Sequence, residues 1–526
     1  MMSKHTLALA ITVSLLSGCD SESSSNTTNT STHRDKGTTI PLIEGSAIAS
    51  AKTFDTIPEQ FAVDGVDTYI QITPKNSNTR NVAYSNNAPA IHIIAADDGA
   101  KGEKIRRAVM ILQHLLTDLP DSSYGTDKAS IANSMAQRNA TLILTENDDA
   151  NQKLMVELFV KEAYRQGQLQ AWVTSAEPST LEGLDFSSST AFMKSLVEYG
   201  NKQSEEDFEK IISGLIEGII DSDDSPQWLL NSQSLMYREL TVEGDCHYMS
   251  NFSDYCENLG EDADRDAAFE EILHLVQAQG IAPNDKYRDL QASISTRALN
   301  LYNAHKAGLN AVWQPRDSSW QDWAGDDFNA DEIGHSYSHE YFAAVFEAFM
   351  GVSQHNGRGL DGYQALTRSD IETQDSDASR WITGLFHGYL QYTANINSNG
   401  VHTFHTHEFP ESDAAPTFKM NREDALALEE YTYKSQWLLH AKVVGTSPMN
   451  LIANDKDNTL EGNQADNVIN GKAGQDVYLV NANVEDCEVQ KGQTSGYNVV
   501  CSTTGTDTLI NIEEIRFNNA SLTITP

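Results

Sequence analysis

The sequence predicts a mixed α+β protein, with a mostly helical body followed by a β-rich C-terminal module. Three observations predict this fold class. Apolar runs at residues 90–96 and 140–146 have the length of buried strands and enclose a segment with helical spacing. From about residue 204 helical periodicity dominates. After residue 450 Asn, Asp and Gly become dense, and short apolar positions recur among them.

Length and charge restrict the class of protein. The chain has 526 residues, enough for two or three domains and at least one large core. Its formal net charge of −39 repels nucleic acid and anionic lipid, so we expect no nucleic-acid partner. The same charge suits a protein that binds divalent cations or works in salt.

The N-terminus has the pattern of a signal peptide. Lys4 and His5 precede an apolar run at residues 7–16, which is too short to span a bilayer as a mature helix. The following Leu-Ser-Gly-Cys, ending at Cys19, resembles the lipobox of bacterial lipoproteins. The resemblance implies removal of residues 1–18 and lipidation of Cys19, with plain secretion as the alternative. We therefore expect a cell-envelope lipoprotein, periplasmic or at the cell surface, held to the membrane by its lipid.

Residues 19–54 are expected to form a tether. Ser, Thr and Asn dominate this segment, a composition that cannot bury a core. The body then spans residues 55–445, and the C-terminal module spans residues 450–526.

The four remaining cysteines are expected to form two local disulfides. Cys246 is close in sequence to Cys256, and Cys487 is close to Cys501. An oxidising compartment favours disulfides, and each pair falls within one expected domain. Zinc binding by these residues is not favoured, because no Cys-x-x-Cys occurs.

The body should contain a small sheet and many helices. A helix is expected at 102–119, where Ile105, Val109 and Leu112 share one face. A helix at 154–167 and a strand at 170–176 follow. Further helices are expected at 205–221, 267–277, 289–305, 338–351 and near 422–442.

Two of these helices carry residues with metal-binding chemistry. In AAFEEILHLVQ (267–277), Glu270 and His274 are one turn apart and share a face, as two metal ligands on one helix must. Glu271 is placed to act as a general base that activates water. Helix 338–351 offers Glu340 as a third ligand. The alternative is a Glu–His ion pair on a solvated face.

The pattern resembles the His-Glu-x-x-His helix of zinc metallopeptidases, with Glu270 in place of the first His. Glu340, in Glu-Tyr-Phe-Ala-Ala, resembles the third ligand of gluzincins of the lethal-factor type. The resemblance implies that Glu270, His274 and Glu340 bind zinc and that Glu271 is the base. A carboxylate in place of imidazole also admits Mn²⁺ or Ca²⁺.

The resemblance also requires a group that stabilises the oxyanion of a tetrahedral intermediate. Tyr337 is the candidate, and His335 and His339 are alternatives. The spacing of the tyrosine departs from the family pattern.

The C-terminal module contains three nine-residue units, at 453–461, 462–470 and 471–479. Each has Asn or Asp at its sixth place and an apolar or aromatic residue at its eighth: Asn458 and Leu460, Asn467 and Ile469, Asp476 and Tyr478. These units resemble the RTX calcium-binding nonapeptide, which forms a parallel β-roll.

The resemblance implies calcium binding in these turns, with Asn467 and Asp476 as ligands and Gly471 and Gly474 as turn residues. Only the third unit keeps both Gly474 and Asp476, and the second has Asn467 where Asp is expected. A calcium-free β-rich cap is the alternative.

The combined expectation is a lipid-anchored, metal-dependent peptidase that uses zinc and carries calcium-binding repeats. Its substrate would be a peptide or a protein. The alternative is a non-catalytic calcium-binding surface lipoprotein that serves adhesion or scaffolding and retains the shape of a peptidase.

Overall fold

The structure is a computed structural model. It describes residues 37–76, 89–96, 102–176, 183–202, 227–240, 267–315, 336–352, 359–398, 415–420, 434–492 and 496–525. Helices and strands are both abundant, so the fold belongs to the expected α+β class. The signal peptide with Cys19, the pair Cys246 and Cys256, and the expected helix at 205–221 lie outside the described residues.

A six-stranded sheet forms the centre of the body. Its strands follow one another in chain order, from β1 through β4 antiparallel and from β4 through β6 parallel. β4 and β5 are buried along their whole length, as the two apolar runs predicted. β6 lies at the edge of the sheet. The bounds are β1 Thr38–Ile40, β2 Ile48–Phe54, β3 Thr68–Pro74, β4 Ile91–Ala95, β5 Thr141–Thr145 and β6 Ser232–Met236.

Helices cover both faces of this sheet. Neighbouring strand residues Ile93 and Ile94 belong to two different cores, as alternation along a strand requires. One core includes α2 (Gly102–Leu115), α3 (Lys128–Gln137) and α10 (Ala268–Val276). The other includes α4 (Asp148–Arg165), α5 (Leu169–Ala176) and α6 (Ser189–Gly200).

The strand expected at 170–176 was wrong, because this segment forms helix α5. Leu169 and Val173 are both buried and are four residues apart, which is the spacing of a helix face. Both residues pack into the same core as α4, and this packing favours a helix over a strand here.

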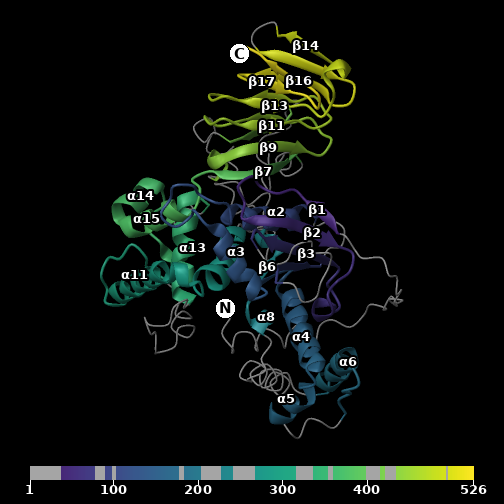
Figure 1. Cartoon of the computed structure of the whole chain (residues 1–526), viewed down its shortest axis with the longest axis vertical. Coiled ribbons are helices and arrows are strands. Elements are labelled where there is room, and N and C mark those ends of the chain that lie inside the picture. Colours follow the sequence, from purple (N-terminus) through teal and green to yellow (C-terminus); the bar gives the residue numbers. More distant parts are fainter. Residues whose placement is uncertain are drawn as a thin grey trace.

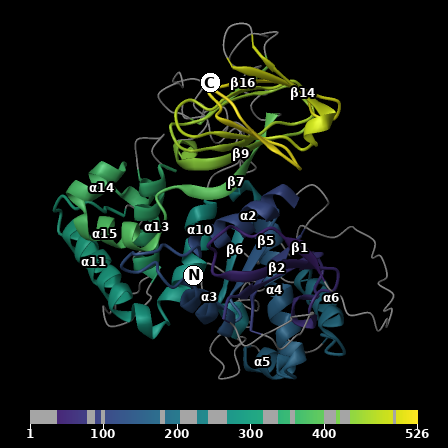
Figure 2. The ribbon, with the colours of Figure 1, turned by 45° about the horizontal axis from the view of Figure 1, so that its top comes forward.

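The second helical layer is built around α13 (Ser336–Met350). It packs against α10 on one side and against α11 (Arg288–Lys306), α14 (Arg368–Gln374) and α15 (Ser376–Leu385) on others (Figures 1 and 2). The short helix α8 (Gln227–Leu230) leads into β6. α10 continues into a π-helical turn at Gln277–Ile281, and the single-turn helix η9 spans Leu360–Gly362.

Two further sheets form a stack that Figure 1 shows above the body, with β7 nearest to it. Consecutive strands from β10 to β13 alternate between the sheets, and their pairing within each sheet is parallel. The pairs β14–β15, β15–β16 and β17–β18 are antiparallel. One sheet contains β8 Thr417–Lys419, β10 Asn450–Ile452, β12 Val468–Asn470, β14 Cys487–Lys491, β15 Tyr497–Cys501 and β16 Gly505–Ile510. The other contains β7 Leu390–Asn397, β9 Leu438–Val444, β11 Thr459–Glu461, β13 Val477–Leu479, β17 Glu514–Arg516 and β18 Ser521–Thr523.

These sheets begin earlier in the chain than residue 450. β7 and β9 pair in parallel, and β9 continues into the stack through β11. The helix expected near 422–442 is therefore wrong at its end, where residues 438–444 form a strand. Leu438, Ala441 and Val443 are buried there because the stack encloses them. Residues 421–433 lie outside the described part.

The apolar positions of the nine-residue units face the interior, as their spacing predicted. The middle residues of the short strands, including Leu460, Ile469 and Tyr478, are buried between the sheets. The predicted disulfide Cys487–Cys501 is confirmed, with an S–S distance of 2.09 Å. It joins directly opposed residues of β14 and β15. Among the described residues, no helix is long and apolar enough to cross a membrane.

Candidate metal centre

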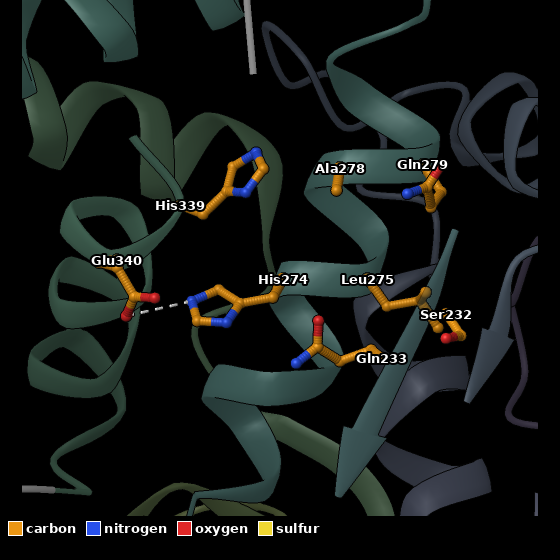
Figure 3. Close-up of a pocket in the computed structure, with 8 residues that line it drawn as sticks. All are labelled: Ser232, Gln233, His274, Leu275, Ala278, Gln279, His339 and Glu340. Atoms are coloured by element: carbon orange, nitrogen blue, oxygen red, sulfur yellow. Dashed lines mark ion pairs between the residues drawn. The ribbon is translucent and has the colours of Figure 1, made fainter. Parts of the chain in front are cut away.

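The acidic face of α10 meets α13. Nε2 of His274 lies 3.6 Å from Oε2 of Glu340, and both residues are at least nine-tenths buried (Figure 3). Nδ1 of the same imidazole lies 3.6 Å from Oε2 of Glu271. Residues far apart in the sequence therefore meet, as the two-helix pattern predicted.

Apolar packing brings the two helices together. Phe269, Ile272 and Leu273 of α10 are fully buried, and the rings of Phe269 and Phe346 are 5.9 Å apart. α13 is buried along nearly its whole length, so its carboxylates are enclosed with it. The core thus places polar side chains where water has little access.

The ligand atoms form two overlapping groups. Atoms of Glu270, Glu271 and His274 lie within 4.8 Å of one another, and so do atoms of Glu270, Glu340 and Asp361. The three residues expected as ligands, Glu270, His274 and Glu340, are thus neighbours. Both groups contain side chains that can bind a cation, and neither identifies the metal.

Asp361 is a candidate ligand that the sequence did not reveal. It lies in η9, far from both helices along the chain, with a left-handed backbone (φ 47°). Gly359 and Gly362 flank it and signal a turn, but a turn signal carries no information about proximity to α10.

The cluster concentrates negative charge. Burial raises the pKa of Glu270 well above its ordinary value, and Glu271, Glu347, Glu340 and Asp361 raise it further. All four neighbours are carboxylates, which repel a second ionised carboxylate in the same site. A bound cation would relieve this repulsion.

The imidazole of His274 responds to the same charges. Burial disfavours its protonated form, but Glu340 and Glu271 outweigh burial and raise its pKa. Its Nε2 is buried and has no hydrogen-bond partner within the described part of the chain. A buried polar atom of this kind is costly unless a ligand satisfies it.

A pocket opens beside this cluster. It is lined by Ser232, Gln233, His274, Leu275, Ala278, Gln279, His339 and Glu340 (Figure 3). Nε2 of Gln233 donates a 2.5 Å hydrogen bond to Oε2 of Glu271 and so fixes that carboxylate. Gln233 belongs to the edge strand β6, and nothing in the sequence linked it to α10.

Tyr337 does not line the pocket. Its ring lies 4.9 Å from that of Tyr302 and 6.3 Å from that of Trp313, and it is almost fully buried. This aromatic cluster faces α11. His339 does line the pocket, with its ring 6.3 Å from that of His274. His335 lies outside the described residues.

In the turns of the C-terminal stack, side-chain amides form hydrogen bonds with backbone groups of the stack itself. Oδ1 of Asn467 accepts a hydrogen bond from the backbone N–H of Asn463, at 3.0 Å. Its Nδ2 donates to the carbonyl of Met449, also at 3.0 Å. Nδ2 of Asn454 donates to the carbonyl of Leu438 in the same way. Both ends of the Asn467 amide are thus hydrogen-bonded to backbone within the stack.

Asp476 retains one available oxygen. Its Oδ1 accepts from the backbone N–H of Asn458, while Oδ2 is buried without a hydrogen-bond partner in the described residues. Burial raises the pKa of Asp476 to about 7. At Gly471 a Cβ would collide with this carboxylate and with the carbonyl oxygen of Asn511. A carboxylate oxygen and a backbone carbonyl oxygen are ligand types that Ca²⁺ uses, and the ion takes about six to eight such oxygens in all.

Gly474 has a backbone that only glycine adopts readily. Its φ is +133°, and a Cβ there would collide with the carbonyl of Lys456. The glycine therefore allows adjacent turns to approach closely, as its place in the repeat suggested.

Comparisons of the chain with protein-family models, with curated proteins and with solved structures found no match.

Proposed function

We propose that the protein is a metal-dependent hydrolase of the peptidase type, with its centre between α10 and α13. Glu270, His274 and Glu340 are the proposed ligands. The observation that carries the proposal is the buried Nε2 of His274, which has no hydrogen bond in the described residues and lies 3.6 Å from Glu340 on a pocket wall. An imidazole and carboxylates from two helices are a donor set for a divalent cation.

A bound divalent cation supplies Lewis acidity, since it lowers the pKa of water and polarises a carbonyl group. Glu271 is the proposed general base. It accepts a hydrogen bond from Gln233 and lies 3.6 Å from Nδ1 of His274, so its carboxylate is held beside the proposed metal ligands, where a general base is required. His339 lines the pocket and Tyr337 does not, so His339 is the proposed donor to the developing oxyanion.

The donor set favours certain metals. One imidazole among several carboxylates is harder than the two-imidazole set of ordinary zinc peptidases. Mn²⁺ therefore competes with Zn²⁺ for this centre. The peptide or protein substrate and the lipid anchor at Cys19 rest on the sequence resemblances.

Hydrolysis of a peptide library tests the proposal. The mature chain, without residues 1–18, is assayed with Zn²⁺ and with Mn²⁺. We expect cleavage by the wild type and a loss of kcat of about 10²–10⁴-fold in Glu271→Gln, with metal retained. His274→Ala should lose both metal and cleavage.

Two results would count against this function. Metal binding without cleavage of any peptide would favour the non-catalytic surface lipoprotein. Equal cleavage by wild type and His274→Ala would place the activity elsewhere in the chain.

We also propose one calcium site in the C-terminal stack, at Asp476 and the carbonyl of Asn511. The orphaned Oδ2 of Asp476 supports it. Calorimetric titration with Ca²⁺ should show one site that Asp476→Asn removes and Asn467→Ala leaves intact. Binding that is lost in Asn467→Ala instead would contradict this assignment.

A further inference from the structure

We propose that Gln279 binds a backbone carbonyl of a peptide substrate through its amide nitrogen, with Arg138 as the residue that positions the amide. This inference rests on the proposed function, because the substrate is the peptide that the metal centre would cleave. Gln279 is only 3% exposed, and it lines the same pocket as His274 and Glu340 (Figure 3). The proposed metal chemistry does not use this side chain.

The backbone of α10 widens where it carries Gln279. Residues Gln277–Ile281 form a π-helical turn, in which the backbone N–H of Ala282 donates to the carbonyl of Gln277 at 2.8 Å. In a regular α-helix Gln279 would lie about 140° around the axis from His274, because 3.6 residues make one turn. A π-helical turn contains more residues, so it rotates Gln279 back toward the side that carries His274.

Helix α3 holds this turn in place. A Cβ at Gly280 would collide with the side chains of Ile131 and Met135, so the glycine lets the two helices approach closely. The hydroxyl of Ser134 donates to the carbonyl of Gln279 at 3.1 Å. The backbone at Gln279 is therefore fixed before a substrate binds, which reduces the entropy that binding costs.

Arg138 determines which end of the Gln279 amide is available to a substrate. Nε of Arg138 donates a 2.9 Å hydrogen bond to Oε1 of Gln279. A guanidinium has only donors, so this contact requires the amide oxygen on its side and leaves Nε2 on the other. Within the described part of the chain, Nε2 of Gln279 donates no hydrogen bond. An almost fully buried amide on a pocket wall thus keeps a donor for a ligand.

The pocket favours a neutral acceptor over an anionic one. Glu340 lies on its wall, and Glu271 lies directly behind Gln233, from which it accepts a hydrogen bond. No Lys or Arg is among the described residues that line the pocket. The carboxylates repel an anion, so a backbone carbonyl fits better than the terminal carboxylate of a peptide. We therefore expect cleavage at internal peptide bonds.

The test compares kcat and KM of two Gln279 variants on the library peptide that the wild type cleaves fastest. Gln279→Glu keeps an oxygen for Arg138 and removes the donor, while Gln279→Met removes the amide without adding charge. We expect KM to rise roughly 3–10-fold in both, because each loses one hydrogen bond to the substrate. The kcat and the bound metal should stay at their wild-type values.

Two controls separate substrate binding from damage to the fold. Gln137→Glu is the matched control, because Gln137 is exposed at the end of α3, next to Arg138 and outside the pocket. It should behave as the wild type does. Thioamides, whose sulfur is a weaker acceptor than oxygen, are placed one at a time at the carbonyls beside the scissile bond. One of them should raise KM for the wild type and not for Gln279→Met, a coupling that requires direct contact.

The outcomes distinguish this inference from the proposed function. An unchanged KM in both Gln279 variants, or equal thioamide effects in wild type and Gln279→Met, would overturn the inference and leave the hydrolase proposal standing. Loss of bound metal and of kcat in both variants would overturn it too, because Gln279 would then support the centre. Cleavage only beside a free C-terminus would contradict the neutral acceptor. No cleavage of any peptide by the wild type would overturn both the inference and the proposed function.

Discussion

The acidic cluster of the body and the polar turns of the C-terminal stack both bury oxygen-bearing side chains. The two regions differ in which groups these side chains face. In the stack, Asn467 and Asn454 use their amides to satisfy backbone groups of neighbouring turns. In the body, Glu270, Glu340 and Asp361 face one another with His274 beside them.

The difference lies in the donors available. An amide carries both donors and acceptors, so a stack of turns can satisfy itself without an ion. An ionised carboxylate only accepts, so a buried group of them requires protons or a cation. The body is therefore the part of the molecule whose stability should respond to transition metals.

The largest expected effect is metal-dependent stability of the body. Zn²⁺ or Mn²⁺ at a hundred times its Kd should raise the free energy of unfolding of the wild type by about 2.7 kcal/mol. Glu270→Gln, which removes the shared carboxylate, should show no such rise. Denaturant unfolding with and without metal measures both. If the metal raised the free energy of unfolding of Glu270→Gln as much as that of the wild type, this prediction would be wrong.

A second prediction concerns His114, a buried histidine whose pKa is lowered by burial and by basic neighbours. Burial lowers the pKa of His114 from 6.5 to about 3, and His387, Lys128 and Arg107 lower it further. Between these pH values the unfolded chain binds a proton that the folded chain does not, so stability falls as pH falls from 6.5 toward 3. From pH 6.5 to 5 this group alone should cost about 2 kcal/mol.

His114→Leu should remove that share of the acid sensitivity. The measurement is the change in unfolding free energy between pH 6.5 and 5, compared for wild type and variant. An unchanged difference would show that the imidazole is not held neutral in the fold.

The smallest expected effect is in the stack. Asn467→Ala removes two hydrogen bonds to neighbouring backbone and should lower the free energy of unfolding by roughly 1 kcal/mol. The loss should be the same with and without Ca²⁺, because the amide rather than an ion satisfies the turn. A loss that appears only when Ca²⁺ is present would mean that Asn467 is a ligand after all.

The sequence predicted what depends on local spacing. Glu270 and His274 are one turn apart on any helix, and the apolar positions of the repeats fix which residues face inward. The strands β4 and β5 and the disulfide Cys487–Cys501 followed from similarly local patterns.

What the sequence did not predict depends on tertiary contact. Asp361 and Gln233 reach the site from a turn and from an edge strand, and neither carries a local signal. α5 became a helix because its core partners lie four residues apart, and β9 a strand because β7 and β11 pair with it.

The most direct test of a cation between α10 and α13 is crystallography with anomalous scattering from Zn²⁺ or Mn²⁺. The account predicts an anomalous peak about 2.0–2.2 Å from a ring nitrogen of His274 and in contact with the Glu270 and Glu340 carboxylates. Well-ordered side chains at this position without any peak, in crystals soaked with either metal, would contradict it.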